Sequence, residues 1–315
     1  MTMRLIARTP QALVFSALVF SALVCLALTI ASCSKSEEPK YRTFASPEDA
    51  VRALNDAVSK GNVEDVVAIF GPEGKDLIDS SDPVSARKNR EVYTVAVKEG
   101  WKLVDGGDHK ELVIGKEGWP FPVPLVKEDA GWRFDTAAGK EEILDRRIGK
   151  NELKAIQICR AYVAAQQRYA REGHDGKPAG LYAQRLRSDE GRQNGLYWPI
   201  ARGVKRSPFG DLLGTAADDR AAQSPASPFY GYYFRILTGQ GEKAGGGARE
   251  YIVNGNMTGG FALVAWPAQY DVTGVMTFVV NQDGHVHEHD FGPGTEATVK
   301  ALARYDPDTS WSAVN

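Results

Sequence analysis

The sequence is poor in cysteine, with only Cys25, Cys33 and Cys159 among its 315 residues. Three cysteines are too few for a disulfide framework, so hydrophobic cores must stabilise the folded protein. An excess of positive charge is also lacking, because 38 lysines and arginines face 40 acidic residues and the net charge is −2. We therefore expect no nucleic acid among the partners of this protein.

Catalytic and nucleotide-binding motifs are lacking as well. The sequence contains no G-x-S-x-G, no H-E-x-x-H and no G-x-x-x-x-G-K-[ST]. Its glycine-rich runs, GGGARE and NGNMTGG, do not open a helix after a strand and are typical of hairpin tips. The sequence thus predicts no catalytic residue and no cofactor.

The first 33 residues have the pattern that most clearly indicates where the protein is located. Arg4 and Arg8 come before any acidic residue, residues 12–31 are almost wholly apolar, and the polar run SKSEEPK starts at Ser34. A basic start, an apolar segment and small residues at its end are typical of a secretory signal peptide, which we predict over residues 1–32. The apolar run is also nearly long enough to span a bilayer, so a plain transmembrane anchor is the alternative.

The segment Ile30-Ala31-Ser32-Cys33 resembles a bacterial lipobox. This resemblance implies cleavage before Cys33, a diacylglycerol on its thiol and an acyl chain such as palmitate on the new amino group. Several acyl chains, at about 0.8 kcal/mol per buried methylene, hold a protein stably on a membrane. The expected location is the cell envelope, facing the periplasm. Ser34 predicts the outer membrane under the usual proteobacterial sorting rule.

After a lipidated tether, predicted over residues 33–43, the pattern is that of an α+β domain over residues 44–136. Three helices are predicted first, because helical periodicity follows three good N-caps, Ser46, Asn62 and Asp82. Period-two alternation then predicts two hairpins. The order, and the phrase LVKEDAGWRFD, resemble nuclear-transport-factor-like (cystatin-like) domains, which implies helices packed across a curved antiparallel sheet.

A connecting helix is predicted over residues 137–150, ending near Gly149, and Asn151 is the expected N-cap of a longer helix. A long irregular region follows, and then four antiparallel strands between YGYYFRILTG and HVHEHDF. One long helix before four such strands resembles the globular part of type IV pilins and pseudopilins, which implies a second α+β domain over residues 151–315. The helix begins in mid-chain, whereas a true pilin needs an apolar N-terminal helix to polymerise.

As a whole, the mature chain resembles a bacterial family known only as domain of unknown function 2950. The phrases that carry this resemblance are FASPEDAVRAL, EGWPFPVPLVKEDAGWRFDTAAGKEEILDRRIGKNEL, NGLYWP, YGYYFRILTGQG, GGFALVAWPAQYDVTGVMTFVVNQDG and YDP. Together they span most of residues 44–310. The resemblance implies a secreted or lipid-anchored envelope protein, and it brings no activity and no functional residues.

Three histidines, His285, His287 and His289, alternate along the last predicted strand. Successive Cα atoms on one face of a strand are roughly 6–7 Å apart, and a His-x-His pair can supply two ligands to zinc. Glu288 is expected on the opposite face, and no second metal-ligating cluster is near in sequence. A solvated strand face is therefore favoured over a metal site, and a surface that responds to pH near 6 is a third hypothesis.

Other chemically reactive residues have plainer interpretations. Cys159 lies on the apolar stripe of its helix and is predicted to be a buried small side chain. Glu172 and Asp175, in EGHDGKPAG, are too few acids for a calcium loop, so a structural turn is expected. The aromatic residues are more suggestive. Four of them in the first domain are candidates for lining a ligand pocket at the mouth of a curved sheet: Trp101, Trp119, Phe121 and Trp132.

The sequence therefore favours a lipid-anchored, non-enzymatic envelope protein that acts as a binding or scaffolding module, with another envelope protein as a candidate partner. A hydrolase or other enzyme with a pocket in the N-terminal domain is the alternative, and metal binding through HVHEH is another. A deep N-terminal pocket with a histidine or paired acids would favour the enzyme. An apolar or filled interior would favour the binding module.

Overall fold

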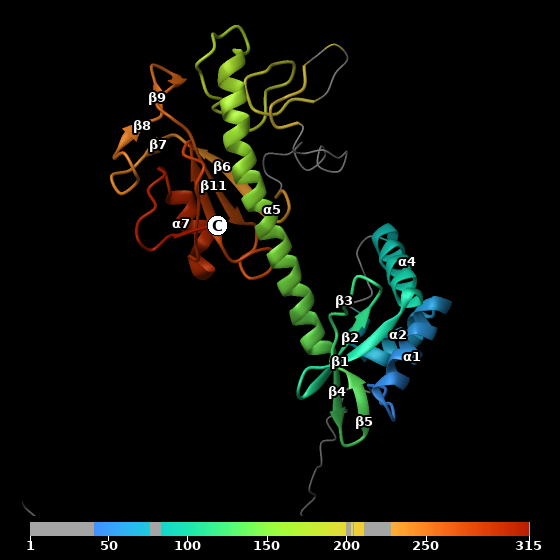
Figure 1. Cartoon of the computed structure of the whole chain (residues 1–315). Coiled ribbons are helices and arrows are strands. Elements are labelled where there is room, and N and C mark those ends of the chain that lie inside the picture. Colours follow the sequence, from blue (N-terminus) through green and yellow to red (C-terminus); the bar gives the residue numbers. More distant parts are fainter. Residues whose placement is uncertain (1–40, 76–82, 200–202, 204, 211–227, 315) are drawn as a thin grey trace, which may run out of the picture. The chain divides into compact units, whose positions relative to one another are not determined.

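The computed structural model describes residues 41–75, 83–199, 203, 205–210 and 228–314. Both helices and antiparallel sheets are present, which confirms the predicted α+β class (Figure 1). The described residues form two hydrophobic cores, one between Phe44 and Phe134 and the other between Ala155 and Tyr305. The predicted signal peptide and Cys33 lie outside the described residues.

Among its described residues, the first part of the chain contains helices α1, α2 and α4, followed by a five-stranded antiparallel sheet. Its elements are α1 (Pro47–Lys60), α2 (Val63–Phe70), α4 (Pro83–Glu99), β1 (Trp101–Asp105), β2 (His109–Ile114), β3 (Trp119–Pro120), β4 (Leu125–Glu128) and β5 (Gly131–Phe134). The strand order is β1-β2-β4-β5, and β3 pairs with β2. The three helices and the two hairpins that the sequence predicts are all present.

Helix α1 begins and ends where the sequence predicts. The Ser46 hydroxyl accepts a hydrogen bond from the Asp49 amide at 3.1 Å, and a proline occupies the first turn. Gly61 ends the helix with a left-handed backbone (φ 67°), which glycine adopts without a steric penalty. Asn62 then caps α2 by accepting from the Asp65 amide at 3.2 Å. Each such cap is worth about 1 kcal/mol, so local polar signals set these helix ends.

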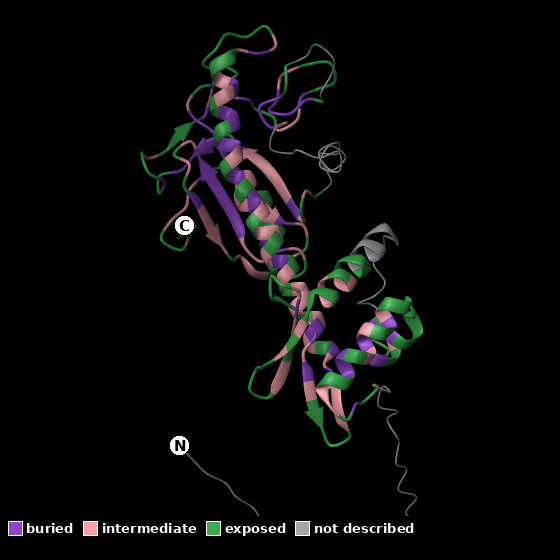
Figure 2. Cartoon of the chain, turned by 45° about the vertical axis from the view of Figure 1, so that its right-hand side comes forward, coloured by how far each residue is buried: buried purple, intermediate pink, exposed green. Residues whose placement is uncertain are grey.

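The first core lies between the helices and the first sheet, and buried residues occur on both (Figure 2). Leu54 of α1 and Ile69 of α2 are almost fully buried, and so are Leu112, Ile114 and Leu125 on the strands. Full burial of one such side chain stabilises the fold by about 1.5–3 kcal/mol. Packing between helices and sheet therefore forms the first core.

Helix α5 (Thr136–Glu172) is continuous over 37 residues. The break that the sequence predicts between Gly149 and Asn151 is wrong. Gly149 lies in the helix interior, where a glycine lowers helix stability by about 1 kcal/mol relative to alanine. Tertiary contacts of the next turn offset this loss. The side-chain Nδ2 of Asn151 donates to the carbonyl oxygen of Thr273 at 2.9 Å, so this side chain does not cap a new helix. Within the described part of the chain, no helix combines the length and the apolar character needed to cross a membrane.

Glu152, on the same turn of α5, holds the start of a distant strand. Its Oε1 accepts from the backbone amides of Val275 at 2.9 Å and Met276 at 3.0 Å. These amides precede strand β12 (Thr277–Asn281), so the carboxylate fixes the sheet against α5.

The second large sheet also has five antiparallel strands, in the order β14-β13-β12-β11-β6. It includes the four predicted strands β6 (Tyr232–Leu237), β11 (Ala262–Pro267), β12 and β13 (Val286–His289), and the short β14 (Ser312–Ala313). The remaining elements are the ribbon of β7 (Gly239–Gln240) with β8 (Arg249–Glu250), the ribbon of β9 (Ile252–Val253) with β10 (Asn256–Met257), the 3-10 helix η1 (Gly292–Gly294) and α7 (Thr295–Ala301).

The two faces of β6 are covered by different helices. The Tyr232 hydroxyl, buried on the α5 side, donates to the carbonyl oxygen of Met276 at 2.9 Å. Arg235, on the opposite side, donates to the carbonyl oxygens of Val299 at 2.6 Å and Leu302 at 2.8 Å. Carbonyl groups at a helix end have no partner within the helix, and Arg235 supplies one for α7. Tyr232 and Arg235 thus lie on opposite faces of the strand, as the period of two residues in a strand requires.

Replacement of Glu152 with alanine removes the acceptor of two backbone amides and is expected to lower the free energy of unfolding by about 1–3 kcal/mol. Glu152→Gln keeps a side-chain oxygen of the same reach and should retain most of the stability. Urea unfolding of both variants beside the wild type measures the difference. Equal stability of Glu152→Ala and the wild type would contradict this role.

Candidate functional site

The three tryptophans predicted to line an N-terminal pocket lie on different strands of the first sheet. Trp101 on β1 and Trp119 on β3 are both paired with Ile114 of β2, because β1 and β3 flank this end of β2. Trp101 and Trp132 pack against the first core, whereas Trp119 is 48% exposed, with the Arg146 guanidinium 5.6 Å from its ring centroid. Their role in ligand binding stays a prediction.

Phe121, the fourth candidate, is part of an aromatic cluster that fills the first core. The ring centroids of Phe70 and Phe134 are 5.2 Å apart, and that of Phe121 lies 6.3 Å from Phe134 and 5.6 Å from Tyr93. The Tyr93 hydroxyl donates to Asn55 Oδ1 at 2.7 Å, which satisfies the polar group of this cluster. The interior at this place is filled and apolar.

The three alternating histidines have different surroundings. His285 is exposed and precedes β13. His287 Nδ1 lies 3.3 Å from the Tyr305 hydroxyl, and His289 Nδ1 lies 2.9 Å from the carbonyl oxygen of Ser310. Among the residues that the structure describes, no group of three or more His, Cys, Asp or Glu side chains is arranged to hold a metal ion.

Cys159 is buried in the second core, as the sequence predicts. Burial raises the pKa of its thiol to about 12. The thiol is therefore protonated and inaccessible at neutral pH, which makes it unsuited to act as a nucleophile.

The segment EGHDGKPAG is a turn, which confirms the structural interpretation. The Lys177 amide donates to the carbonyl oxygen of His174 at 2.9 Å. Both acids of the segment are bound by cations: Glu172 lies 2.8 Å from Lys205 Nζ, and Asp175 pairs with Arg192. These carboxylates stabilise the turn.

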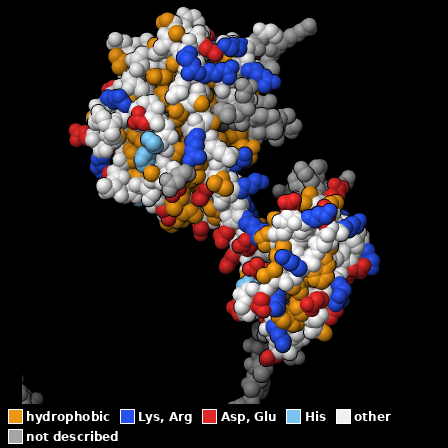
Figure 3. All heavy atoms as spheres, viewed as in Figure 1, with side chains coloured by type: hydrophobic (Ala, Val, Ile, Leu, Met, Phe, Trp, Pro, Cys, Tyr) orange, Lys and Arg blue, Asp and Glu red, His pale blue; other side chains and the backbone are white. Residues whose placement is uncertain are grey.

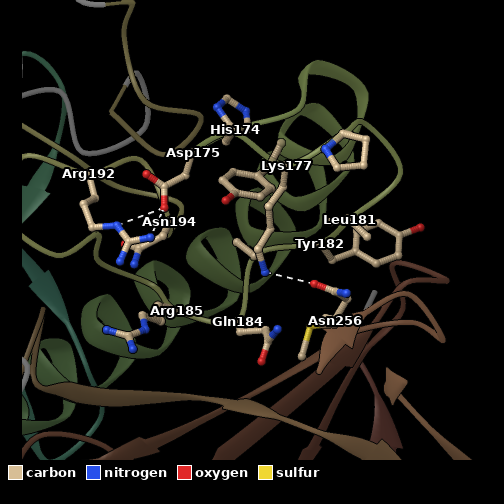
Figure 4. A pocket seen from close by; sticks show the side chains of 14 residues that line it. His174, Asp175, Lys177, Leu181, Tyr182, Gln184, Arg185, Arg192, Asn194 and Asn256 are labelled. Atoms are coloured by element: carbon tan, nitrogen blue, oxygen red, sulfur yellow. Dashed lines mark hydrogen bonds and ion pairs between the residues drawn. The ribbon is translucent and has the colours of Figure 1, made fainter. Parts of the chain in front are cut away.

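A pocket of about 200 Å³ lies at the C-terminal end of α5 (Figure 4). Its walls come from the last turns of α5, from residues 174–194 and from β10. The apolar wall includes Tyr169, Leu181, Tyr182 and Met257, and the polar side chains include Lys177, Gln184, Arg185, Arg192, Asn194 and Asn256.

A buried glutamine fixes one wall of this pocket to α5. Gln166 is fully buried, and its side-chain amide both donates to the carbonyl oxygen and accepts from the amide of Ala183, each at 2.8 Å. The same segment is also bound to β10. The backbone amide of Tyr182 donates to the carbonyl oxygen of Met257 at 2.9 Å. Residues far apart in sequence are thereby held as one rigid wall.

Polar contacts also hold the charged side chains in place. Arg192 binds the Asp175 carboxylate through Nε and Nη2, and Lys177 Nζ donates to Asn256 Oδ1 at 2.9 Å. The Arg192 guanidinium holds the pKa of Asp175 below its usual range. Asp175 therefore stays ionised and is a weak proton acceptor near neutral pH.

His174 lies in the wall with its imidazole stacked on the Tyr169 ring and tilted against the Trp198 ring. The ring centroid of Tyr169 is 4.2 Å away and that of Trp198 is 5.5 Å away. Its side chain is 6% exposed, and Nε2 has no hydrogen-bond partner, since the closest Glu172 oxygen is 3.8 Å away. Burial lowers the pKa of His174. The neutral imidazole is thus the form that the fold favours.

The sequence does not predict this pocket, because the segment after the long helix, from HDGKPAGLYAQRL through SPASPFY, has no regular pattern. A signal was present in the high content of cations and amides, with one tyrosine, in KPAGLYAQRLRSDEGRQNG. The partner residues Asn256 and Met257 belong to a distant hairpin, and no local pattern connects them to this segment.

Comparison with known proteins identifies a family. The model of a family described as "Protein of unknown function (DUF2950)" matches residues 41–314, which confirms the family that the sequence phrases indicate. No curated protein and no solved structure matches the chain.

The buried His174 makes stability depend on pH. Its pKa is lower in the folded than in the unfolded protein, where it is about 6.5. The unfolded chain therefore binds more protons, and stability is lost as the pH falls below about 6.5. His174→Phe removes this titration and is expected to reduce the loss of stability between pH 7.5 and pH 5.5. Urea unfolding at both pH values measures it, and an unchanged pH dependence in the variant would contradict the assignment.

Proposed function

The chain belongs to the DUF2950 family, and on that premise we propose that it is a lipid-anchored protein of the cell envelope that binds a ligand or partner without catalysing a reaction. The lipid anchor would be Cys33, and residues 33–43 would connect it to the folded part, which the structure describes from residue 41. Support for the anchor comes from the apolar run and the lipobox-like Ile30–Cys33. Ser34 supports the outer membrane, on the periplasmic side.

The observation that carries the binding role is the composition of the pocket at the end of α5. Its lysine, arginines and amides are hydrogen-bond donors suited to hold a ligand. Arg192 is fixed by Asp175, Lys177 by Asn256 and Arg185 by Asp189. The carboxylate in its wall is a weak base, because Arg192 stabilises its ionised form. These groups are suited to recognition and poorly suited to proton transfer.

The filled first core also supports binding over catalysis. An enzyme with its active site beneath the N-terminal helices needs a cavity there with a histidine or paired acids. Phe70, Phe121 and Phe134 instead pack their rings against one another at this place.

We also propose a finer architecture for the two parts of the chain. Residues 44–136 would be a cystatin-like domain, supported by helices α1, α2 and α4 and the antiparallel sheet that follows them. Residues 151–315 would be a pilin-like domain, supported by one long helix packed on antiparallel strands. Because α5 continues from Thr136, its N-terminal half belongs to the connection between them.

Lipidation is tested by replacing Cys33 with serine in the native host. The wild type is expected to incorporate labelled palmitate, to lose residues 1–32 by intact mass and to sediment with membranes. Cys33→Ser should lose the label and the cleavage. Cys25→Ser is the matched control, because Cys25 lies within the predicted leader and its replacement should leave both unchanged. Equal processing of Cys33→Ser and the wild type would contradict the proposal, and recovery in the inner-membrane fraction would contradict the outer-membrane location.

A further inference from the structure

We infer, on the premise of the proposed binding role, that the pocket at the end of α5 binds an acidic sugar, that is, a sugar ring that carries a carboxylate. Charge, spare hydrogen-bond donors and the apolar wall each point to this class of ligand.

The first observation is the sign of the charge around the pocket. Lys177, Arg185 and Arg192 line it, and Asp175 is the only acid among its described lining residues. Arg185 pairs with Asp189 outside the lining, so the excess of positive charge comes from Lys177. Lys and Arg side chains also gather on the visible surface over the end of α5 and the adjoining loop (Figure 3). A cleft with an excess of one charge attracts ligands of the opposite charge, so an anion is favoured.

The second observation is that the contacts of these cations leave donors for a ligand. A guanidinium has five N–H donors and an ammonium has three. Arg192 uses Nε and Nη2 on Asp175, which leaves Nη1, and Lys177 is bound to the neutral amide of Asn256. In Figure 4, Arg192 and Asn194 lie on one side of the pocket and Lys177 and Asn256 on another. A carboxylate between them would accept charge-assisted hydrogen bonds from both cations.

The third observation is the combination of aromatic and amide side chains. Tyr182 and Leu181 are partly exposed and contribute apolar surface on which the apolar face of a sugar can pack, and the buried Tyr169 and Met257 lie behind them in the wall. The Gln184 side chain donates to the carbonyl oxygen of Gly255 at 2.9 Å, which leaves its Oε1 and one N–H for the hydroxyl groups of a ligand. The volume of about 200 Å³ is below the range of roughly 300–1,000 Å³ for drug-sized ligands, which fits a single ring.

Asp175, the acid in the wall, favours a carboxylate ligand over a phosphate ligand. Asp175 is ionised, and its charge opposes a doubly charged phosphate more strongly than a singly charged carboxylate. A carboxylate also matches the planar fork of Arg192. A hexuronate residue therefore fits the charge better than a phosphate monoester does.

The test is calorimetric titration of the full chain, purified in detergent, with D-glucuronate, D-glucose and inorganic phosphate at low salt. We expect glucuronate to bind with a Kd on the order of 1 mM, as suits a ligand of this size, and glucose and phosphate to bind at least about tenfold more weakly. Lys177→Gln should weaken glucuronate binding by about tenfold and leave the unfolding midpoint unchanged, because the Lys177 side chain is exposed.

Arg171→Gln is the charge-matched control. Arg171 is exposed on the last turn of α5 and does not line the pocket, so this variant should bind glucuronate like the wild type. Loss of affinity in both variants, or in neither, would overturn the assigned site. Phosphate or glucose binding as strong as glucuronate binding would overturn the ligand class. Absence of glucuronate binding would overturn this inference alone, since the fate of Cys33→Ser decides the membrane anchor independently.

Discussion

The continuity of α5 is the constraint on which the rest of the structure depends. Near its N-terminus, Thr136 Oγ1 donates to the carbonyl oxygen of Phe70 at 2.6 Å, in the first core. In its middle, Glu152 accepts from the amides that precede β12. Near its C-terminus, Gln166 binds the wall of the candidate pocket. One continuous helix therefore contributes contacts to both cores and to the wall of the pocket.

The polar groups of α5 stabilise the fold because distant backbone groups satisfy them. Tyr162 is fully buried, and its hydroxyl donates to the carbonyl oxygen of Ala262 at 3.2 Å. Burial, together with the nearby Glu152 carboxylate, raises the pKa of Glu288 on β13. This carboxyl lies on the α5 side of the sheet, opposite to the histidines, as the sequence predicts. Helix and sheet thus meet through a few specific polar contacts within an apolar interface.

Local physics explains what the sequence predicts correctly and where it fails. The caps Ser46 and Asn62 act within three residues, and strand alternation acts within one strand, so both are visible in the sequence. The predicted break at Gly149 is wrong because contacts of the next turn with Thr273, more than a hundred residues away, favour a continuous helix. The pocket escapes prediction for the same reason, since it brings residues 174–194 to Met257.

Hydrogen exchange of the backbone amides of residues 147–154 tests the account most directly. In a continuous helix these amides donate to carbonyl groups four residues earlier, so they are expected to exchange as slowly as those of the flanking turns. Exchange in this segment at the rate of an exposed loop would show that α5 is interrupted. The shared support for the two cores and the pocket would then be contradicted.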